Sequence, residues 1–115
     1  MTRPREVRHA AGFDEWLRCA AETPWLQPKF KKVKKAIKNM RDVGPSYPAF
    51  ESHRMENLKG PGDRDIWNSY VESRTSNAWR MYWQWYDDAI VIISVGPHDH
   101  QPGNQPPVPK KPRSK

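Results

Sequence analysis

The feature that most constrains the fold is a stretch of strict alternation at residues 79–86. Its odd positions carry tryptophan or methionine, and its even positions carry arginine, tyrosine or glutamine. Successive side chains of a strand point to opposite faces, so this stretch predicts a strand with one apolar and one polar face. We expect the tryptophan face to form a core against helices, and the face with Arg80 and Tyr82 to be open.

The neighbouring segments extend this strand into a sheet. Residues 89–95 are nearly all aliphatic, which is typical of a central strand covered on both faces. Residues 66–73 predict a further strand, bounded by turns at residues 59–63 and 75–77. Residues 5–9 are compatible with one more short strand. The second half of the chain therefore predicts a small meander.

The N-terminal half has helical spacing instead. Apolar residues recur at intervals of three and four over residues 12–22, and Pro24 closes that helix. A second helix starts near Pro28, keeps an apolar stripe as far as Met40 and ends before Gly44. The chain is therefore predicted to have an α+β fold, with two N-terminal helices packed on a small, mostly antiparallel sheet of about four strands.

The positive charge is concentrated in two segments. The formal net charge is +7, and residues 29–41 carry seven cations without an acid, so they forgo the ion pairs that usually stabilise an exposed helix. Such a polarised protein is expected to be steered towards a polyanion, and nucleic acid, acidic lipid and an acidic protein partner all fit the charge. The candidate residues for binding nucleic acid, and RNA in particular if the chain acts on RNA, are Lys31, Lys32, Lys34, Lys35, Lys38, Arg74 and Tyr82.

The second basic segment is the C-terminus. Residues 101–115 carry four cations, five prolines and no acid, which predicts a disordered tail after a folded domain at residues 1–100. The single cysteine, Cys19, excludes an internal disulfide and suits a reducing cytoplasm. No apolar run is long enough to span a bilayer, so we expect a cytoplasmic protein without membrane association.

Several features stand in a fixed order between Pro28 and His100. They are the lysine-rich amphipathic helix, the segments Glu56-Asn57-Leu58-Lys59-Gly60 and Ile66-Trp67, the alternating strand, the turn Asp87-Asp88, and the closing segment Ile92-Ile93-Ser94-Val95-Gly96-Pro97-His98. In this order and at these spacings, the sequence resembles the RelE/ParE toxin superfamily. The resemblance implies the toxin of a type II toxin-antitoxin system, an mRNA endoribonuclease associated with the ribosome that inhibits translation. Its partners would be mRNA, the ribosome and a cognate antitoxin.

The resemblance also implies a site that cleaves RNA through the 2′-hydroxyl and needs no metal or other cofactor. The matching residues are Glu56 as general base, Arg80 at the phosphate, Lys59 as the basic residue of the turn, and His98 as general acid. These residue types suit the chemistry, because such cleavage needs a base for the hydroxyl, positive charge at the phosphorane and a proton for the leaving oxygen.

Two other functions remain open for the same fold. ParE-type relatives inhibit DNA gyrase and are not nucleases, although the presence of Glu56 and His98 favours cleavage. A non-catalytic protein that binds nucleic acid or a host factor, for instance one encoded by a phage, is the third reading. Tyr70 favours that reading, because many nucleases of the family have an arginine there, and no tyrosine follows Tyr86.

Ordinary structural roles are also open for several of these residues. Arg80 would form a surface ion pair of little energetic value if it met Glu72 across the strands. The histidines at 98 and 100 would form a zinc site only with further ligands such as Cys19 or His53.

Overall fold

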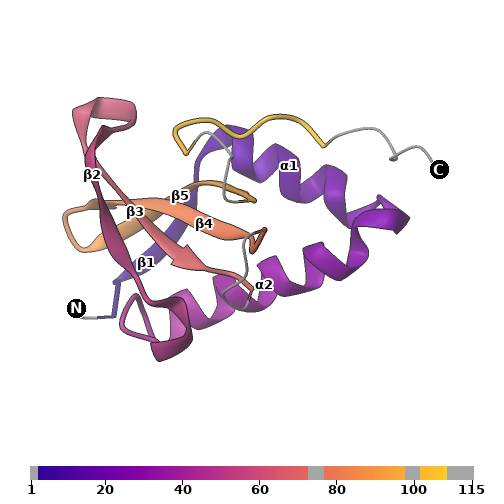
Figure 1. Ribbon diagram of the computed structural model, residues 1–115, viewed down its shortest axis with the longest axis horizontal. Coiled ribbons are helices and arrows are strands. Elements are labelled where there is room, and N and C mark those ends of the chain that lie inside the picture. The colour runs from indigo at the N-terminus through magenta and orange to yellow at the C-terminus, as the bar shows by residue number, and fades with distance from the viewer. Residues whose placement is uncertain (1–2, 73–76, 98–101, 109–115) are drawn as a thin grey trace.

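The computed structural model describes residues 3–72, 77–97 and 102–108. Within these residues, two helices lie on one face of a five-stranded sheet with the strand order β1-β5-β4-β3-β2 (Figure 1). The strands are β1 (Glu6–His9), β2 (His53–Lys59), β3 (Asp65–Tyr70), β4 (Arg80–Tyr86) and β5 (Ala89–Gly96), and the helices are α1 (Ala11–Ala21) and α2 (Gln27–Asp42). The α+β class and the two N-terminal helices are therefore confirmed.

The sheet is mostly antiparallel, as predicted, but it has one more strand and one parallel pair. It has five strands in the described part of the chain, and β1 runs parallel to β5 while the other neighbouring pairs are antiparallel. The strand β2 was not predicted, because it lies at the sheet edge and its side chains do not alternate regularly between core and solvent. Its register shifts between Arg54 and Lys59, and Asn57 there has a φ of 56°, so a bulge breaks the period-two pattern.

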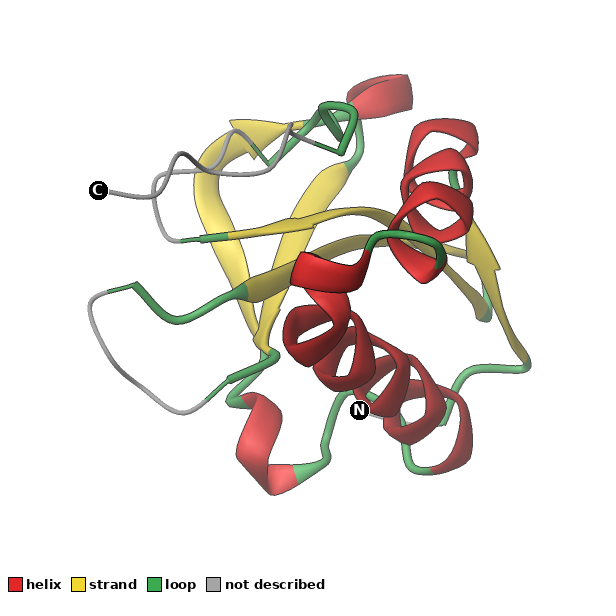
Figure 2. Cartoon of the chain, turned by 90° about the vertical axis from the view of Figure 1, so that its right-hand side faces the viewer, coloured by secondary structure: helices red, strands yellow, loops and turns green. Residues whose placement is uncertain are grey.

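The main core lies between the helices and the sheet. Figure 2 shows both helices on the same side of the strands. Met81 and Trp83 from β4 are fully buried in a cluster with Phe13 of α1 and Val33 of α2, and Trp79 and Trp85 pack at its margin. The predicted orientation of the tryptophan stripe, as core against the helices, is confirmed.

The sequence predicts that the opposite face of the sheet is open, but part of this face is covered. Tyr82 is only 1% exposed and packs in a smaller cluster with Ile66 and Ile93, onto which the bulged β2 folds Met55 and Leu58. The expectation that Tyr82 presents its phenol to RNA is therefore wrong, because an edge strand that the alternation pattern did not reveal covers it.

Residues 102–108 lie against the body, where the sequence predicted disorder. The strand β1 ends at His9, so no strand of the described residues pairs with the part of β5 beyond Ile92 on that edge. There the side-chain Oε1 of Gln105 accepts a hydrogen bond from the Val95 N–H at 2.7 Å, and Val108 packs against the main core. The domain boundary at residue 100 stays a prediction, and residues 109–115 lie outside the described residues.

Candidate functional site

Polar side chains gather on the sheet face opposite the helices. The cross-strand register places four residues in one row, namely His53, Asn68, Tyr82 and Ser94. Two residues further along, Tyr70 of β3 is paired with Arg80 of β4 on the same face. We call His53, Asn68, Tyr70 and Arg80 the polar face.

The guanidinium of Arg80 is held by Tyr70. Its Nη2 donates a hydrogen bond to the Tyr70 hydroxyl at 3.0 Å, and its Cζ lies 4.7 Å from the centroid of the Tyr70 ring. Its Nε is buried without a hydrogen-bond partner among the residues that the structure describes. Arg80 therefore has a fixed orientation, and an arginine held in this way is suited to bind an anion through its guanidinium.

The ordinary surface pair between Arg80 and Glu72 is not formed. Glu72 instead accepts hydrogen bonds from Lys29 at 2.7 Å and Lys32 at 2.9 Å, both on α2, and from the Trp79 N–H at 3.0 Å. Arg80 has no ion pair with any described residue. No carboxylate in the described part of the chain therefore neutralises its positive charge.

His53 is held by the buried amide of Asn68. Its Nε2 accepts a hydrogen bond from Asn68 Nδ2 at 2.9 Å, and its Nδ1–H donates to the Glu51 carbonyl at 3.1 Å. Asn68 is fully buried, and its Oδ1 has no partner within the described part of the chain. The buried amide of Asn68 therefore holds the imidazole of His53 in place.

The structure does not bring Glu56 and Lys59 to Arg80. Glu56 is exposed in the bulge of β2, beside the part of β3 between Trp67 and Asp65, and Lys59 forms an ion pair with Asp65. Arg80 is paired with Tyr70, four residues further along β3, which is about 13 Å at the rise of a strand. His98 and Arg74, the other candidates, lie outside the described residues.

The lysine helix is only partly available to bind RNA. The two α2 lysines that bind Glu72 fix the end of β3 to the helix, and Lys38 pairs with Asp42 at 2.6 Å. The expectation that the helix forgoes ion pairs is therefore wrong, because partners come from the last residue of α2 and from the segment after β3. Lys31, Lys34 and Lys35 are exposed and form no ion pair with a described residue.

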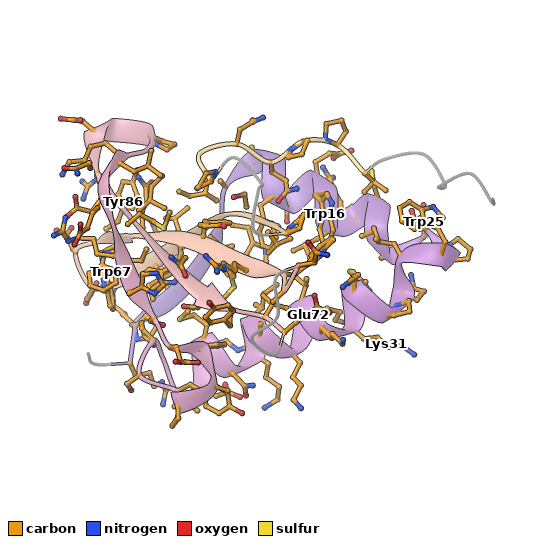
Figure 3. All side chains as sticks on the ribbon, viewed as in Figure 1. Trp16, Trp25, Lys31, Trp67, Glu72 and Tyr86 are labelled. Atoms are coloured by element: carbon orange, nitrogen blue, oxygen red, sulfur yellow. The ribbon has the colours of Figure 1, made fainter. Side chains whose placement is uncertain are left out.

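Glu72 is the most strongly perturbed carboxyl of this region. Burial raises the pKa of Glu72, but the hydrogen bonds from Lys29, Lys32 and the Trp79 N–H have the larger combined effect. Together these contributions lower the pKa from 4.5 to about 2. Figure 3 shows Glu72 between the sheet and α2, whereas Lys31 points away from the body. The side chain of Glu72 is 11% exposed, whereas those of Lys29 and Lys32 are 37% and 55% exposed, so the carboxylate acts as a structural clamp on two lysines that still reach solvent.

Sequence reasoning missed the pair of His53 and Asn68. His53 had been considered only as a zinc ligand, and its segment shows no regular alternation, so no local signal marked it as part of a strand. The described residues contain no group of three side chains that could hold a metal ion. None of the helices in the described ranges is long and apolar enough to cross a membrane.

Comparisons with known proteins identify the fold. No protein-family model and no curated protein sequence matches the chain. Among solved structures, the archaeal RelE-RelB complex of Pyrococcus horikoshii contains a chain with a TM-score of 0.52 and 16% identity, covering 88% of this chain and 100% of that one. A copper-bound mutant toxin of Helicobacter pylori has a TM-score of 0.52 and 15% identity, covering 85% and 96%. The chain therefore has the fold of a RelE-type toxin.

Proposed function

We propose that this protein is the RNA-cleaving toxin of a toxin-antitoxin pair and that its site is the polar face. The observation that carries the proposal is the pair of buried, unpartnered atoms on that face. Within the described residues these are the donor Nε of Arg80 and the acceptor Oδ1 of Asn68. Buried polar atoms without partners are uncommon in folded proteins, and a functional role is one of the explanations for them. The RelE-type fold supports the same assignment.

The chemistry follows from the positions of Arg80 and His53. They lie on either side of β3 and two residues apart along it, so an RNA strand laid diagonally across β3 would pass both side chains. The 2′-oxygen attacks the phosphorus and the 5′-oxygen leaves, which gives a 2′,3′-cyclic phosphate and a 5′-hydroxyl. Arg80 stabilises the negative charge of the phosphorane, and His53 transfers one of the two protons. His98, which lies outside the described residues, remains the sequence-based candidate for the second proton transfer, whereas the register of β2 separates Glu56 from Arg80. The reaction as proposed uses no metal.

The partners follow from charge and from the fold. Lys31, Lys34 and Lys35 form an exposed basic surface that suits the phosphates of mRNA or of the ribosome. The archaeal neighbour was solved as a RelE-RelB complex, and we propose that a cognate antitoxin likewise restrains this protein in the cytoplasm.

Induced expression in a bacterium tests the proposal. Wild type, Arg80→Ala, His53→Ala and the control Arg18→Ala are expressed, growth is followed and transcript 5′ ends are mapped by primer extension. We expect wild type and the control to arrest growth with new cuts, because Arg18 is an exposed residue of α1, and we expect both site variants to lose the cuts. Arrest without cuts would instead indicate a gyrase-type inhibitor, and no arrest would indicate a non-catalytic binding protein.

A further inference from the structure

A pocket of about 350 Å³ lies beside the polar face, between α2, the short helix Pro48–Phe50 and the segment that follows β3. Its size is within the range of about 300–1,000 Å³ that is typical of small-ligand sites. Tyr47 and Tyr70 contribute rings, Asn39 an amide, and Lys32 and Lys35 cations. The pocket therefore combines aromatic surface, an amide and positive charge.

Several polar groups of this pocket are available to a ligand. The side-chain amide of Asn39 and the hydroxyl of Tyr47 form no hydrogen bond with any residue in the described ranges, and Lys35 has no ion-pair partner there. The Tyr47 ring is fixed by an edge contact with Phe50, with centroids 5.1 Å apart. Glu72 also lines the pocket, but Lys29 and Lys32 neutralise its charge. The pocket thus presents a rigid ring and free donors with a net positive charge.

We propose that this pocket binds one nucleotide of the RNA substrate, with the base against Tyr47 and Asn39 and the phosphate at Lys35. This inference rests on the proposed function and deepens it, because it adds a recognition site for a base next to the scissile phosphate. An aromatic ring supplies stacking, an amide can pair with the edge of a base, and a lysine binds phosphate as a point charge. An acidic peptide would use the lysine but not the free amide and phenol together.

Tyr70 connects the pocket to the polar face. It lines the pocket and also holds the guanidinium of Arg80 by stacking and by the hydrogen bond at 3.0 Å. An RNA strand whose scissile phosphate lies at Arg80 therefore passes Tyr70 before its neighbouring nucleotide reaches Asn39. This path continues onto the exposed lysines of α2.

Titration of the full-length, ¹⁵N-labelled protein with nucleotides tests the inference. The probes are AMP, GMP, CMP and UMP, with ribose 5-phosphate and inorganic phosphate as ligands that lack a base. We expect at least one nucleotide to give saturable shifts of the Asn39 side-chain amide and the backbone amides of Lys35 and Val71. We expect Asn39→Ala to weaken that binding roughly fivefold, the loss of one hydrogen bond, and Arg18→Gln on α1 to leave it unchanged.

Three results would overturn the inference. They are the absence of saturable shifts at millimolar nucleotide, equal shifts with ribose 5-phosphate, and shifts caused by a short glutamate-rich peptide but by no nucleotide. The titration is independent of cleavage. Nucleotide binding by a protein that cuts no RNA would contradict the proposed catalysis alone, whereas cleavage by a protein that binds no nucleotide would contradict the pocket alone.

Discussion

The Arg80 guanidinium lies over the ring of Tyr70, with Cζ 4.7 Å from the ring centroid, and donates a hydrogen bond to the Tyr70 hydroxyl at 3.0 Å. Many nucleases of the resembling family have an arginine at the position of Tyr70. Here the tyrosine fixes the arginine of the neighbouring strand instead of adding a second positive charge. The proposed site therefore has one guanidinium with a fixed orientation.

Tyr70→Phe tests this arrangement, because it keeps the ring under Arg80 and removes only the hydroxyl acceptor. We expect the rate of RNA cleavage to fall about tenfold, since hydrogen bonds to charged groups contribute about 1.5–3 kcal/mol. The melting temperature should stay near that of wild type. A cleavage rate equal to that of wild type would show that the hydroxyl does not position Arg80.

His53→Ala removes the proposed proton-transfer group from an exposed position, so the fold should persist. We expect the cleavage rate to fall by about 10²–10⁴-fold and to recover in part when free imidazole is added. Single-turnover assays on a short RNA measure both effects. A variant that cuts at the wild-type rate, or one that imidazole does not restore, would remove His53 from the mechanism.

Glu72→Gln removes the charge that binds Lys29 and Lys32 to the end of β3. The pKa of Glu72 is about 2 in the folded protein, against an ordinary value of 4.5 in the unfolded chain. The ionised carboxylate therefore stabilises the fold fully above pH 4.5, and this stabilisation is lost as the pH falls towards 2. We expect the variant to lose about 2–3 kcal/mol of unfolding free energy at pH 7 and less at pH 3. Urea denaturation at both pH values measures this difference, and an equal loss at both would contradict the assignment.

Trp83→Ala tests the core. Trp83 is fully buried, and its Nε1–H donates to the Ser69 hydroxyl at 2.9 Å. We expect a loss of about 3–5 kcal/mol in the free energy of unfolding, measured by chemical denaturation. Trp25→Ala is the matched control, because Trp25 is only partly buried, and it should lose less.

Truncation tests the C-terminal segment. Removal of residues 102–115 deletes Gln105 and leaves the Val95 N–H without its acceptor, so we expect a loss of about 1–3 kcal/mol in unfolding free energy. Removal of residues 109–115 alone keeps Gln105 and Val108 and should leave stability unchanged. Equal stability of the two truncated proteins would show that the contact at Val95 contributes nothing.

Much of the fold could be predicted from local pattern. The alternation around Trp83 fixed which residues of β4 face the helices, and the spacing of apolar residues located α1 and α2 to within one or two residues. The strand β2 escaped prediction, because it is a bulged edge strand whose polar residues resemble those of a loop. The cover over Tyr82 was missed for the same reason.

The candidate site shows the same division. Arg80 could be predicted, because a polar residue on an alternating strand is assigned to a face by its position alone. The partners of Arg80 and His53 could not, because they come from strands whose register depends on a bulge and on packing far along the chain. Glu56 and Lys59 are close to His53 in sequence, yet the register separates them from Arg80 along β3.

The sequence by itself determined the class of fold, the buried face of β4 and the basic character of α2, because each depends on the periodicity of a single segment. Only the tertiary structure decided which polar residues meet, since cross-strand neighbours are set by register and not by distance along the chain. It also decided that Lys29 and Lys32 serve the clamp on Glu72 while Lys31, Lys34 and Lys35 remain exposed. The carboxylate of Glu72, forty residues after Lys32 in the chain, binds Lys29 and Lys32, and no local sequence pattern predicts that contact.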